Sequence, residues 1–210
     1  MTRILLVDDH AVVRQGLKQI LGDAFAGAVF GEVAGGEEAL RLAEAAEWDL
    51  VILDISLPGQ SGLDALKELR HTRPALPVLV LSMYPEEQFG VRVLRAGAAG
   101  YVAKKTAAAD LVAAVRTVLA GRRYVSPSLA ERLAGEIGLA PGRAPHELLS
   151  DREFQVFRLL ASGKTVTASA ESLGLSVPTV STYRARILEK MGMTENYELV
   201  QYAIVHRLFE

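Results

Sequence analysis

The sequence predicts a doubly wound α/β domain with a five-stranded parallel sheet, followed by a small all-helical domain. Up to about residue 120, short apolar runs alternate five times with amphipathic stretches of helical length, which is typical of a parallel sheet covered on both faces. After Gly121 the strand pattern stops and only helical periodicity remains. A chain of 210 residues, 50% of them hydrophobic, is long enough to bury two such cores.

The first domain is expected to span residues 1–121. Its buried strands are predicted at Ile4–Val7, Val29–Ala34, Leu50–Asp54, Val78–Ser82 and Gly100–Ala103. The helices that follow these strands in turn are predicted at Ala11–Leu21, Glu37–Glu47, Leu63–His71, Glu87–Arg95 and Ala108–Leu119. In an open sheet of this kind, functional residues gather beyond the carboxyl ends of the strands.

Residues 122–147 are expected to form a linker that contains one helix, Ser128–Ile137. The linker then continues into the Gly-, Pro- and Ala-rich segment Gly138–Pro145. Residues 148–210 are expected to form the second domain. Its helices are predicted at 150–163, where Ser150 to Glu153 form a capping box, and then at Thr167–Leu173, Val177–Met191 and Asn196–Leu208.

Composition excludes several classes of protein. The chain has no cysteine, so disulfides, thiolate catalysis and thiolate metal sites are absent. No apolar run approaches the roughly 18 residues of a membrane-spanning helix, and the first residues do not resemble a signal peptide. We therefore expect a cytoplasmic protein with no membrane partner. The formal net charge of −2 does not by itself indicate binding to nucleic acid.

Three acids end predicted strands and should meet at one edge of the sheet: Asp8, Asp9 and Asp54. A single Asp at a strand end is more often a helix cap or a solvated carboxylate. Three together repel one another, and a hard cation such as Mg²⁺ relieves that repulsion. A carboxylate can also accept a phosphoryl group. Two other strand ends supply a hydroxyl at Ser82 and a cation at Lys104, which suit phosphoryl oxygens.

Three segments together resemble the receiver domain of response regulators over about residues 3–120. They are Ile4 to His10 (ILLVDDH), Leu53 to Gly59 (LDISLPG) with Gly62 close behind, and Gly97 to Lys104 (GAAGYVAK). The resemblance implies that Asp54 accepts a phosphoryl group from the phosphohistidine of a sensor histidine kinase. It also implies a regulator that promotes its own Mg²⁺-dependent phosphorylation and dephosphorylation, and not an enzyme with a separate substrate.

The same resemblance implies individual roles around Asp54. Asp9 and Asp54 would ligate Mg²⁺ directly, Asp8 would do so through water, and the backbone carbonyl of Ser56 would be a further ligand. The residues that would hold the phosphoryl group or switch with it are Ser82, Lys104 and, as a rotating aromatic, Tyr101. Taken alone, Tyr101 could be an ordinary aromatic at the edge of the sheet, but the switch role is the favoured interpretation.

The helical domain has the order of a helix-turn-helix, with Val177–Met191 as the helix that enters the major groove. Residues at helical spacing should face its core: Val180, Tyr183, Ile187 and Met191. Other positions could reach DNA, the short polar side chains at base edges and the cations at phosphates. These candidate DNA contacts are Lys164, Thr179, Ser181, Thr182, Arg184, Ala185, Arg186 and Lys190.

Segments of this domain resemble the LuxR-type helix-turn-helix over about residues 148–208. They are Leu149 to Glu153, Leu173 to Val180 and Ile187 to Gly192. Joined to a receiver, this arrangement resembles NarL/FixJ transcriptional regulators, which implies phosphorylation-controlled dimerisation on a two-fold site in double-stranded DNA. Positions 181, 182 and 185 would approach bases. The last helix would supply the contact of the homodimer, with Leu199, Val200, Ala203 and Ile204 as candidates, although packing inside the domain explains their apolarity as well.

The sequence departs from the LuxR-type pattern at two positions, and two alternative functions stay open. Ser169 occupies a position that is usually a buried aliphatic residue, and Ala185 offers no hydrogen bond to a base. The helical domain could bind a protein instead of DNA. A phosphatase with an Asp nucleophile is a poorer alternative, because the expected second Asp is replaced by Ser56. The four histidines have no metal-ligand spacing and are interpreted as structural or exposed.

Overall fold

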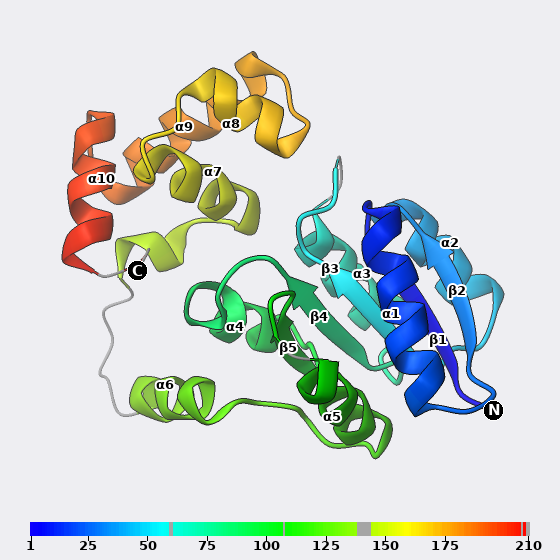
Figure 1. The fold of residues 1–210 in the computed structure, drawn as a ribbon. Coiled ribbons are helices and arrows are strands. Elements are labelled where there is room, and N and C mark those ends of the chain that lie inside the picture. The colour runs from blue at the N-terminus through cyan, green and yellow to red at the C-terminus, as the bar shows by residue number, and fades with distance from the viewer. Residues whose placement is uncertain (59–60, 107, 138–143, 207, 209–210) are drawn as a thin grey trace. The chain divides into compact units, whose positions relative to one another are not determined.

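A computed structural model describes residues 1–58, 61–106, 108–137, 144–206 and 208 (Figure 1). The chain divides into two compact units, residues 1–137 and 138–210. Gly59 and most of the predicted Gly-rich linker, residues 138–143, lie outside the described residues. None of the described helices combines the length and the apolarity that crossing a membrane requires.

The first unit is built on a five-stranded sheet with the order β2-β1-β3-β4-β5, and all four pairings are parallel. This confirms the predicted fold class. The strands are β1 (Arg3–Val7), β2 (Val29–Val33), β3 (Leu50–Asp54), β4 (Val78–Ser82) and β5 (Gly100–Ala103). The predicted bounds of the strands differ from these by one residue at most.

The register of the strands aligns their carboxyl ends. Val7 pairs with Leu53, Asp54 pairs with Leu81, and Ser82 pairs with Ala103. The residues that follow these pairs therefore emerge at the same edge of the sheet. This alignment brings side chains from β1, β3, β4 and β5 into one site, although they are distant in the sequence.

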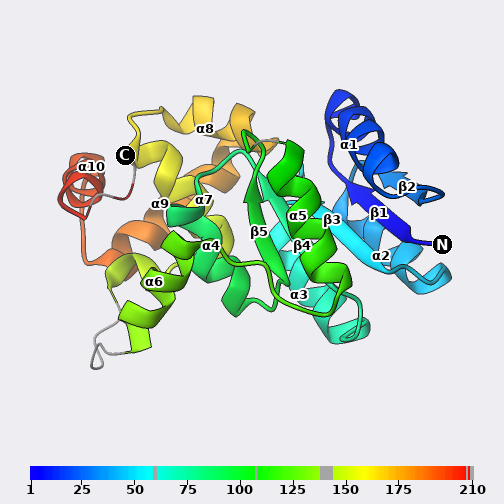
Figure 2. The same ribbon diagram turned by 60° about the horizontal axis from the view of Figure 1, so that its bottom comes forward.

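Helices cover both faces of the sheet (Figures 1 and 2). They are α1 (Ala11–Ala24), α2 (Gly36–Ala45), α3 (Gly62–Thr72), α4 (Glu86–Arg95) and α5 (Ala108–Leu119). On one face, α1 and α5 pack over a buried cluster that includes Leu21, Ile52, Leu79 and Val115. On the other face lie α2, α3 and α4. Both faces of the central strands are thus buried, which explains their continuous apolar sequences.

A sixth helix, α6 (Pro127–Ile137), belongs to the first unit and contacts α4. The sequence had suggested that this helix is part of a linker spanning residues 122–147. The predicted helix of this segment is present, and its apolar position Leu129 is buried.

The second unit is all-helical, as predicted. It contains the 3-10 helix η1 (Pro145–Leu148), α7 (Asp151–Ala161), α8 (Val166–Leu173), α9 (Val177–Met191) and α10 (Asn196–Val205). The predicted capping box is present, because the Ser150 hydroxyl accepts from the Glu153 amide while the Glu153 carboxylate accepts from the Ser150 amide. Gly174 adopts φ +61° after α8, which turns the chain into α9.

Two predictions about this unit need correction. Helix α10 ends at Val205 and not at Leu208, because the Leu208 amide donates to the Ala203 carbonyl in a closing turn. The buried positions of α9 include Leu188, which the predicted stripe omitted, and Tyr183 is only partly buried.

Ser169 is fully buried, and its hydroxyl has no hydrogen-bond partner among the described residues.

Candidate functional site

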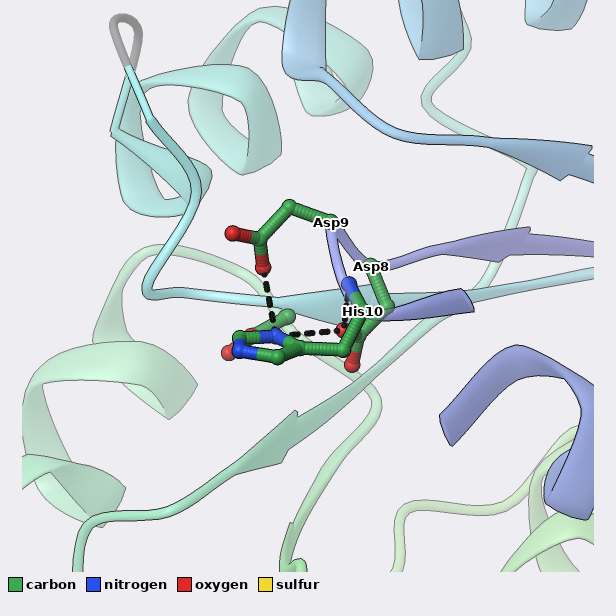
Figure 3. Close-up of side chains that lie close together, drawn as sticks. Asp8, Asp9 and His10 are labelled. Carbon is green, nitrogen blue, oxygen red and sulfur yellow. Dashed lines mark hydrogen bonds and ion pairs between the residues drawn. The ribbon is translucent and has the colours of Figure 1, made fainter. Parts of the chain in front are cut away.

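The predicted acids meet at the carboxyl edge of the sheet. Asp8 and Asp54 are almost fully buried, at 2% and 1% exposure. Asp9 and His10 lie beside them, and one ligand atom from each of these four residues lies within 4.8 Å of the others. Figure 3 shows the carboxylate of Asp9 and the imidazole of His10 turned toward each other at the end of β1. The sequence therefore placed the acid cluster correctly.

His10 is the member of this cluster that the sequence reasoning missed. Its Nδ1 atom lies 2.8 Å from Asp9 Oδ1 and 3.3 Å from Asp8 Oδ1 (Figure 3). The side chain of His10 is 65% exposed, so the ring lies at the mouth of the site above the buried Asp8. The available signal was that His10 directly follows the acid pair in the sequence. A search for metal-ligand spacing among the histidines alone does not detect a histidine that joins two aspartates.

Lys104 neutralises part of the charge of this cluster. Its Nζ atom lies 2.6 Å from Asp8 Oδ2 and 2.7 Å from Asp54 Oδ2, and its side chain is 7% exposed. Burial alone lowers the pKa of Lys104, but hydrogen bonds and charges from Asp54 and Asp8 outweigh this, so the pKa is raised. The ammonium therefore stays charged between two buried carboxylates.

Asp54 is held in a fixed orientation. The Ser56 amide donates to Asp54 Oδ1 at 3.0 Å, while Lys104 binds Oδ2. Burial raises the pKa of Asp54, and the hydrogen bonds from Lys104 and Ser56 only partly oppose this effect. A desolvated, oriented carboxylate of higher basicity is a suitable nucleophile toward a phosphoryl group.

Gly62, the first residue of α3, lies close to the backbone at the end of β3. A Cβ atom at this position would lie 2.1 Å from the backbone oxygen of Asp54 and 2.6 Å from Ile55 Cα. The Gly62 amide donates to the Ile55 carbonyl, and the Ser61 hydroxyl caps the start of α3. Only glycine allows α3 to begin in contact with the backbone of Asp54.

Ser82 and Tyr101 are both bound to one residue of the loop that leads to α4. The Tyr84 amide donates to Ser82 Oγ at 3.1 Å, and Tyr101 Oη donates to the Tyr84 carbonyl at 2.7 Å. Tyr101 is 1% exposed, so its ring is buried even though β5 is an edge strand of the sheet. The peptide groups of Tyr84 thus connect the two predicted switch residues.

The donor set suits a hard divalent cation. Carboxylate oxygens dominate it, two of the carboxylates are desolvated, and such ligands are those that Mg²⁺ prefers. Lys104 contacts Asp8 and Asp54 but not, in the described contacts, Asp9. Oxygen atoms of the acids thus remain for an ion beside the ammonium.

On α9, the predicted DNA-contacting residues are not equivalent. Ser181, Thr182, Ala185 and Arg186 are exposed, whereas Thr179 and Arg184 are partly buried. Three of the predicted basic contacts already have hydrogen-bond partners within the unit. Arg184 Nε donates to Asn196 Oδ1 at 2.6 Å, Lys190 Nζ to Glu153 Oε2 at 2.7 Å, and Lys164 Nζ to Ser172 Oγ at 3.0 Å.

The predicted dimer residues of α10 also fall into two sets. Leu199 and Ala203 are buried in the core of the unit, at 0% and 1% exposure, and Val200 is partly buried. Ile204 is 72% exposed. The sequence reasoning missed two further apolar residues that α10 exposes, Tyr197 at 66% and Val205 at 71%.

The fold and the site define a phospho-acceptor domain joined to a helix-turn-helix domain. Comparison with known families supports both parts: the family "Response regulator receiver domain" matches residues 4–116, and "Bacterial regulatory proteins, luxR family" matches residues 147–203. The chain belongs to the response regulators of NarL/FixJ type, and it is a two-component response regulator with a LuxR-type DNA-binding domain. This family consists of regulators and not of classical enzymes, as the sequence predicted.

Individual relatives match along almost the whole chain. The chain is 38% identical to "Response regulator GacA" of Pseudomonas viridiflava, over 100% of this chain and 99% of the relative. It is similar to RcsB from Salmonella enterica serovar Typhimurium bound to promoter rprA in the presence of phosphomimetic BeF3⁻, with 26% identity, a TM-score of 0.64 and coverage of 96% and 98%. It also matches a structure of two RcsB dimers bound to two parallel DNAs, with 26% identity, a TM-score of 0.59 and coverage of 96% and 97%.

Proposed function

We propose that Asp54 accepts a phosphoryl group from a sensor histidine kinase and that this controls binding of the second domain to DNA. The observation that carries this proposal is the ammonium of Lys104 between the buried carboxylates of Asp8 and Asp54. Asp54 provides the nucleophile, and Lys104 provides a cation beside it for the oxygens of the transferred phosphoryl group. The function as a two-component response regulator is common to the family.

The transfer would proceed by attack of an Asp54 carboxylate oxygen on phosphorus. The new P–O bond forms as the P–N bond to the kinase histidine breaks, and the histidine nitrogen keeps the electron pair. Mg²⁺, held by Asp8, Asp9, Asp54 and the carbonyl of Ser56, would supply charge neutralisation at the phosphoryl oxygens. Lys104 would move from the carboxylate of Asp54 to a phosphoryl oxygen, since its Nζ atom already lies beside the acceptor.

Ser82 would transmit this change. The phosphoryl group adds about −1.5 to −2 charges, for which a hydroxyl is a natural donor. If Ser82 turns toward the new oxygens, the hydrogen bond from the Tyr84 amide is lost. Because Tyr101 binds the carbonyl of the same residue, the loop and the Tyr101 ring would rearrange together.

The output would be a homodimer on a two-fold site in double-stranded DNA. Ser181, Thr182 and Ala185 would approach bases, since they are exposed on α9. The residues that would contact phosphates or position the helix are Lys164, Thr179, Arg184, Arg186 and Lys190. For the dimer we propose Ile204 of the predicted set, joined by Tyr197 and Val205, because Leu199 and Ala203 are internal.

The family resemblance further supports a cytoplasmic protein with a receiver at residues 1–121, a linker at 122–147 and the DNA-binding domain at 148–210. In this proposal the linker helix α6 packs on α4, which the contacts between these two helices support. The kinase that acts on Asp54 would dock on the receiver.

The proposal is tested by retrieving genomic DNA fragments with the purified protein, with and without a small phosphodonor and Mg²⁺. Asp54→Asn is compared with Asp23→Asn, which changes an exposed acid outside the cluster. We expect phosphodonor to strengthen enrichment of a shared two-fold motif in the wild type and in Asp23→Asn but not in Asp54→Asn. Intact-protein mass should show one phosphoryl group under the same conditions.

Other outcomes would reject parts of the proposal. Equal enrichment with and without phosphodonor, in both the wild type and Asp54→Asn, would reject the phosphorylation switch. No enrichment in any condition would reject DNA as the target of the second domain and favour a protein partner. A weak dependence of affinity on salt would also argue against DNA, because phosphate contacts impose a steep slope. Steady hydrolysis of a phosphoester would revive the phosphatase alternative.

A further inference from the structure

Helix α6 packs on α4, and a close contact between Leu129 of α6 and Gly90 of α4, here called the seat, lies between the two helices. Leu129 is 1% exposed. A Cβ atom at Gly90 would lie 2.8 Å from both Leu129 Cδ1 and Leu129 Cδ2. The side chain of Leu129 therefore fills the space that any larger residue at position 90 would need. This seat accounts for a glycine in the middle of α4, where alanine would favour the helix more.

Polar contacts hold the beginning of α6 against the beginning of α4. Glu86 Oε1 accepts hydrogen bonds from the hydroxyls of Ser126, at 2.6 Å, and Ser128. Ser126 Oγ in turn accepts from the Leu129 amide at 3.1 Å and so caps α6. One carboxylate in the first turn of α4 thus connects to the cap of α6.

The segment that leads into α6 lies along the edge of β5. The Tyr124 amide donates to the Ala99 carbonyl at 2.8 Å, and Tyr124 forms a β-bridge with Gly100. A Cβ atom at Gly100 would lie 2.8 Å from the Tyr124 carbonyl oxygen. The chain is therefore closely packed against the strand that carries Tyr101.

The residue beside the seat of α6 contacts Tyr84, which binds the two predicted switch residues. Phe89, which precedes Gly90, stacks on Tyr84 with a centroid distance of 5.0 Å and an interplanar angle of 19°. Tyr84 binds both Ser82 and Tyr101 through its peptide groups. A displacement of Tyr84 would therefore be transmitted through Phe89 to the part of α4 on which Leu129 rests.

We propose that α6 is a strap whose seat on α4 is controlled by phosphorylation of the receiver. It is seated while Tyr84 binds Ser82 and Tyr101, and it loosens when Ser82 turns to the phosphoryl group. Because α6 precedes the Gly-rich segment that leads to the helix-turn-helix domain, its release lengthens the connection between the domains. The proposal rests on the function proposed for Asp54, and phosphorylation can act only by stabilising the unseated state more than the seated one.

The first test is hydrogen exchange of the α6 amides in the full chain, with and without a phosphodonor and Mg²⁺. We expect the donor to raise the exchange rate of α6 by about tenfold, toward the rate in Leu129→Ala, as in a local opening. The control is Leu148→Ala, which shortens a half-exposed leucine outside the seat and should leave α6 unchanged. In Asp54→Asn the donor should have no effect.

Tyr101→Phe tests the strap without phosphorylation. This change removes only the hydroxyl that binds the Tyr84 carbonyl, and we expect it to raise α6 exchange by itself. Unchanged exchange in Tyr101→Phe would overturn the strap whether or not Asp54 is phosphorylated. Unchanged exchange with donor, when intact mass shows full phosphorylation, would overturn it while leaving the proposed function intact. Absence of phosphorylation would instead reject the function proposed for Asp54.

A double-mutant comparison tests the seat itself. Gly90→Ala should loosen the packing of α6 in the wild type and raise its exchange, because the added methyl group displaces the terminal methyl groups of Leu129. In the Leu129→Ala background the same change should have no further effect, because room for the methyl group is then available. If Gly90→Ala leaves α6 exchange unchanged in the wild-type background, the seat does not exist as described.

Discussion

At the scale of single residues, Lys104 is the main counter-charge of the acid cluster. Asp8 and Asp54 are nearly inaccessible to water, and both are within 2.7 Å of the Lys104 ammonium. Removing one member of a buried ion pair leaves the other uncompensated, which is more destabilising than the pair itself is stabilising. A divalent cation bound to the same acids should replace part of the missing charge.

Lys104→Met should therefore destabilise the receiver by about 3 kcal/mol without divalent cations, and Mg²⁺ should recover more stability in this variant than in the wild type. Urea unfolding followed by Trp48 fluorescence measures this, since the single tryptophan lies in the first unit. Lys105→Met is the control, because Lys105 is exposed. Equal stabilisation by Mg²⁺ in Lys104→Met and wild type would contradict a shared site.

Position 62 is a second place where the surroundings determine which residue fits. Gly62→Ala would push a methyl group into the backbone of Asp54 and Ile55, and we expect a loss of about 1–3 kcal/mol in receiver stability. Gly16→Ala is a matched control, because a Cβ there meets nothing within 4 Å and alanine favours helix α1. The same fluorescence-detected unfolding compares them, and similar stability in the two variants would refute the close approach.

At the scale of elements, an ion pair connects α7 and α9. Lys190 Nζ lies 2.7 Å from Glu153 Oε2, and Glu153 also closes the capping box of α7. Burial raises the pKa of Glu153, but hydrogen bonds from Lys190 and Ser150 outweigh it, so its pKa is lowered. A carboxyl whose pKa is lower in the folded state stabilises that state above its unfolded pKa, about 4.3 for Glu. This stabilisation is lost as the pH falls through the folded-state pKa.

Glu153→Gln should thus destabilise the helical unit by about 1–2 kcal/mol at pH 7, and the difference from wild type should shrink as the pH falls below about 4. Amide signals of α7 to α10 in a urea titration of the full chain report this stability. Glu171→Gln, at an exposed position of α8, should show no such dependence. A destabilisation that persists unchanged at low pH would show that the charge of Glu153 is irrelevant.

At the scale of the whole molecule, we propose that the exposed apolar residues of α10 form a contact between two chains. Tyr197, Ile204 and Val205 are each at least 66% exposed on one helix. Single exposed apolar residues are ordinary, but several on one helix form a surface that a second copy can cover. It shares Ile204 with the contact predicted from the sequence, whereas Leu199 and Ala203 of that prediction lie in the core of the unit.

Ile204→Asp should lower affinity for a two-fold DNA site by about tenfold or more, because the charge would be buried in the dimer contact, while affinity for a half-site stays the same. Fluorescence anisotropy at one fixed salt concentration measures both affinities. Leu148→Asp is the control, since Leu148 is half-exposed on η1 and not on α10. An equal loss for half-site and two-fold site would indicate damage to the fold and not to the dimer.

The sequence by itself determined the class of fold, the order of the elements and the identity of the acid cluster. Buried parallel strands and amphipathic helices have different periods, so the alternation is readable from local pattern alone. Strand ends in a parallel sheet share one edge, so Asp8, Asp54 and Lys104 could be placed together before any distance was known. Capping chemistry is equally local, which is why the box at Ser150 was predicted correctly.

Only the tertiary structure decided which neighbours these residues have. Periodicity identifies an apolar residue but not its partner, so the sequence could not distinguish Leu199 in the core from Ile204 at the surface. It could not show that Asn196 binds Arg184. The role of Gly90 was also hidden, because it depends on Leu129, which is distant in sequence and comes close only in the folded chain. Contacts of this kind arise from packing in three dimensions, where residues of several elements compete for the same space.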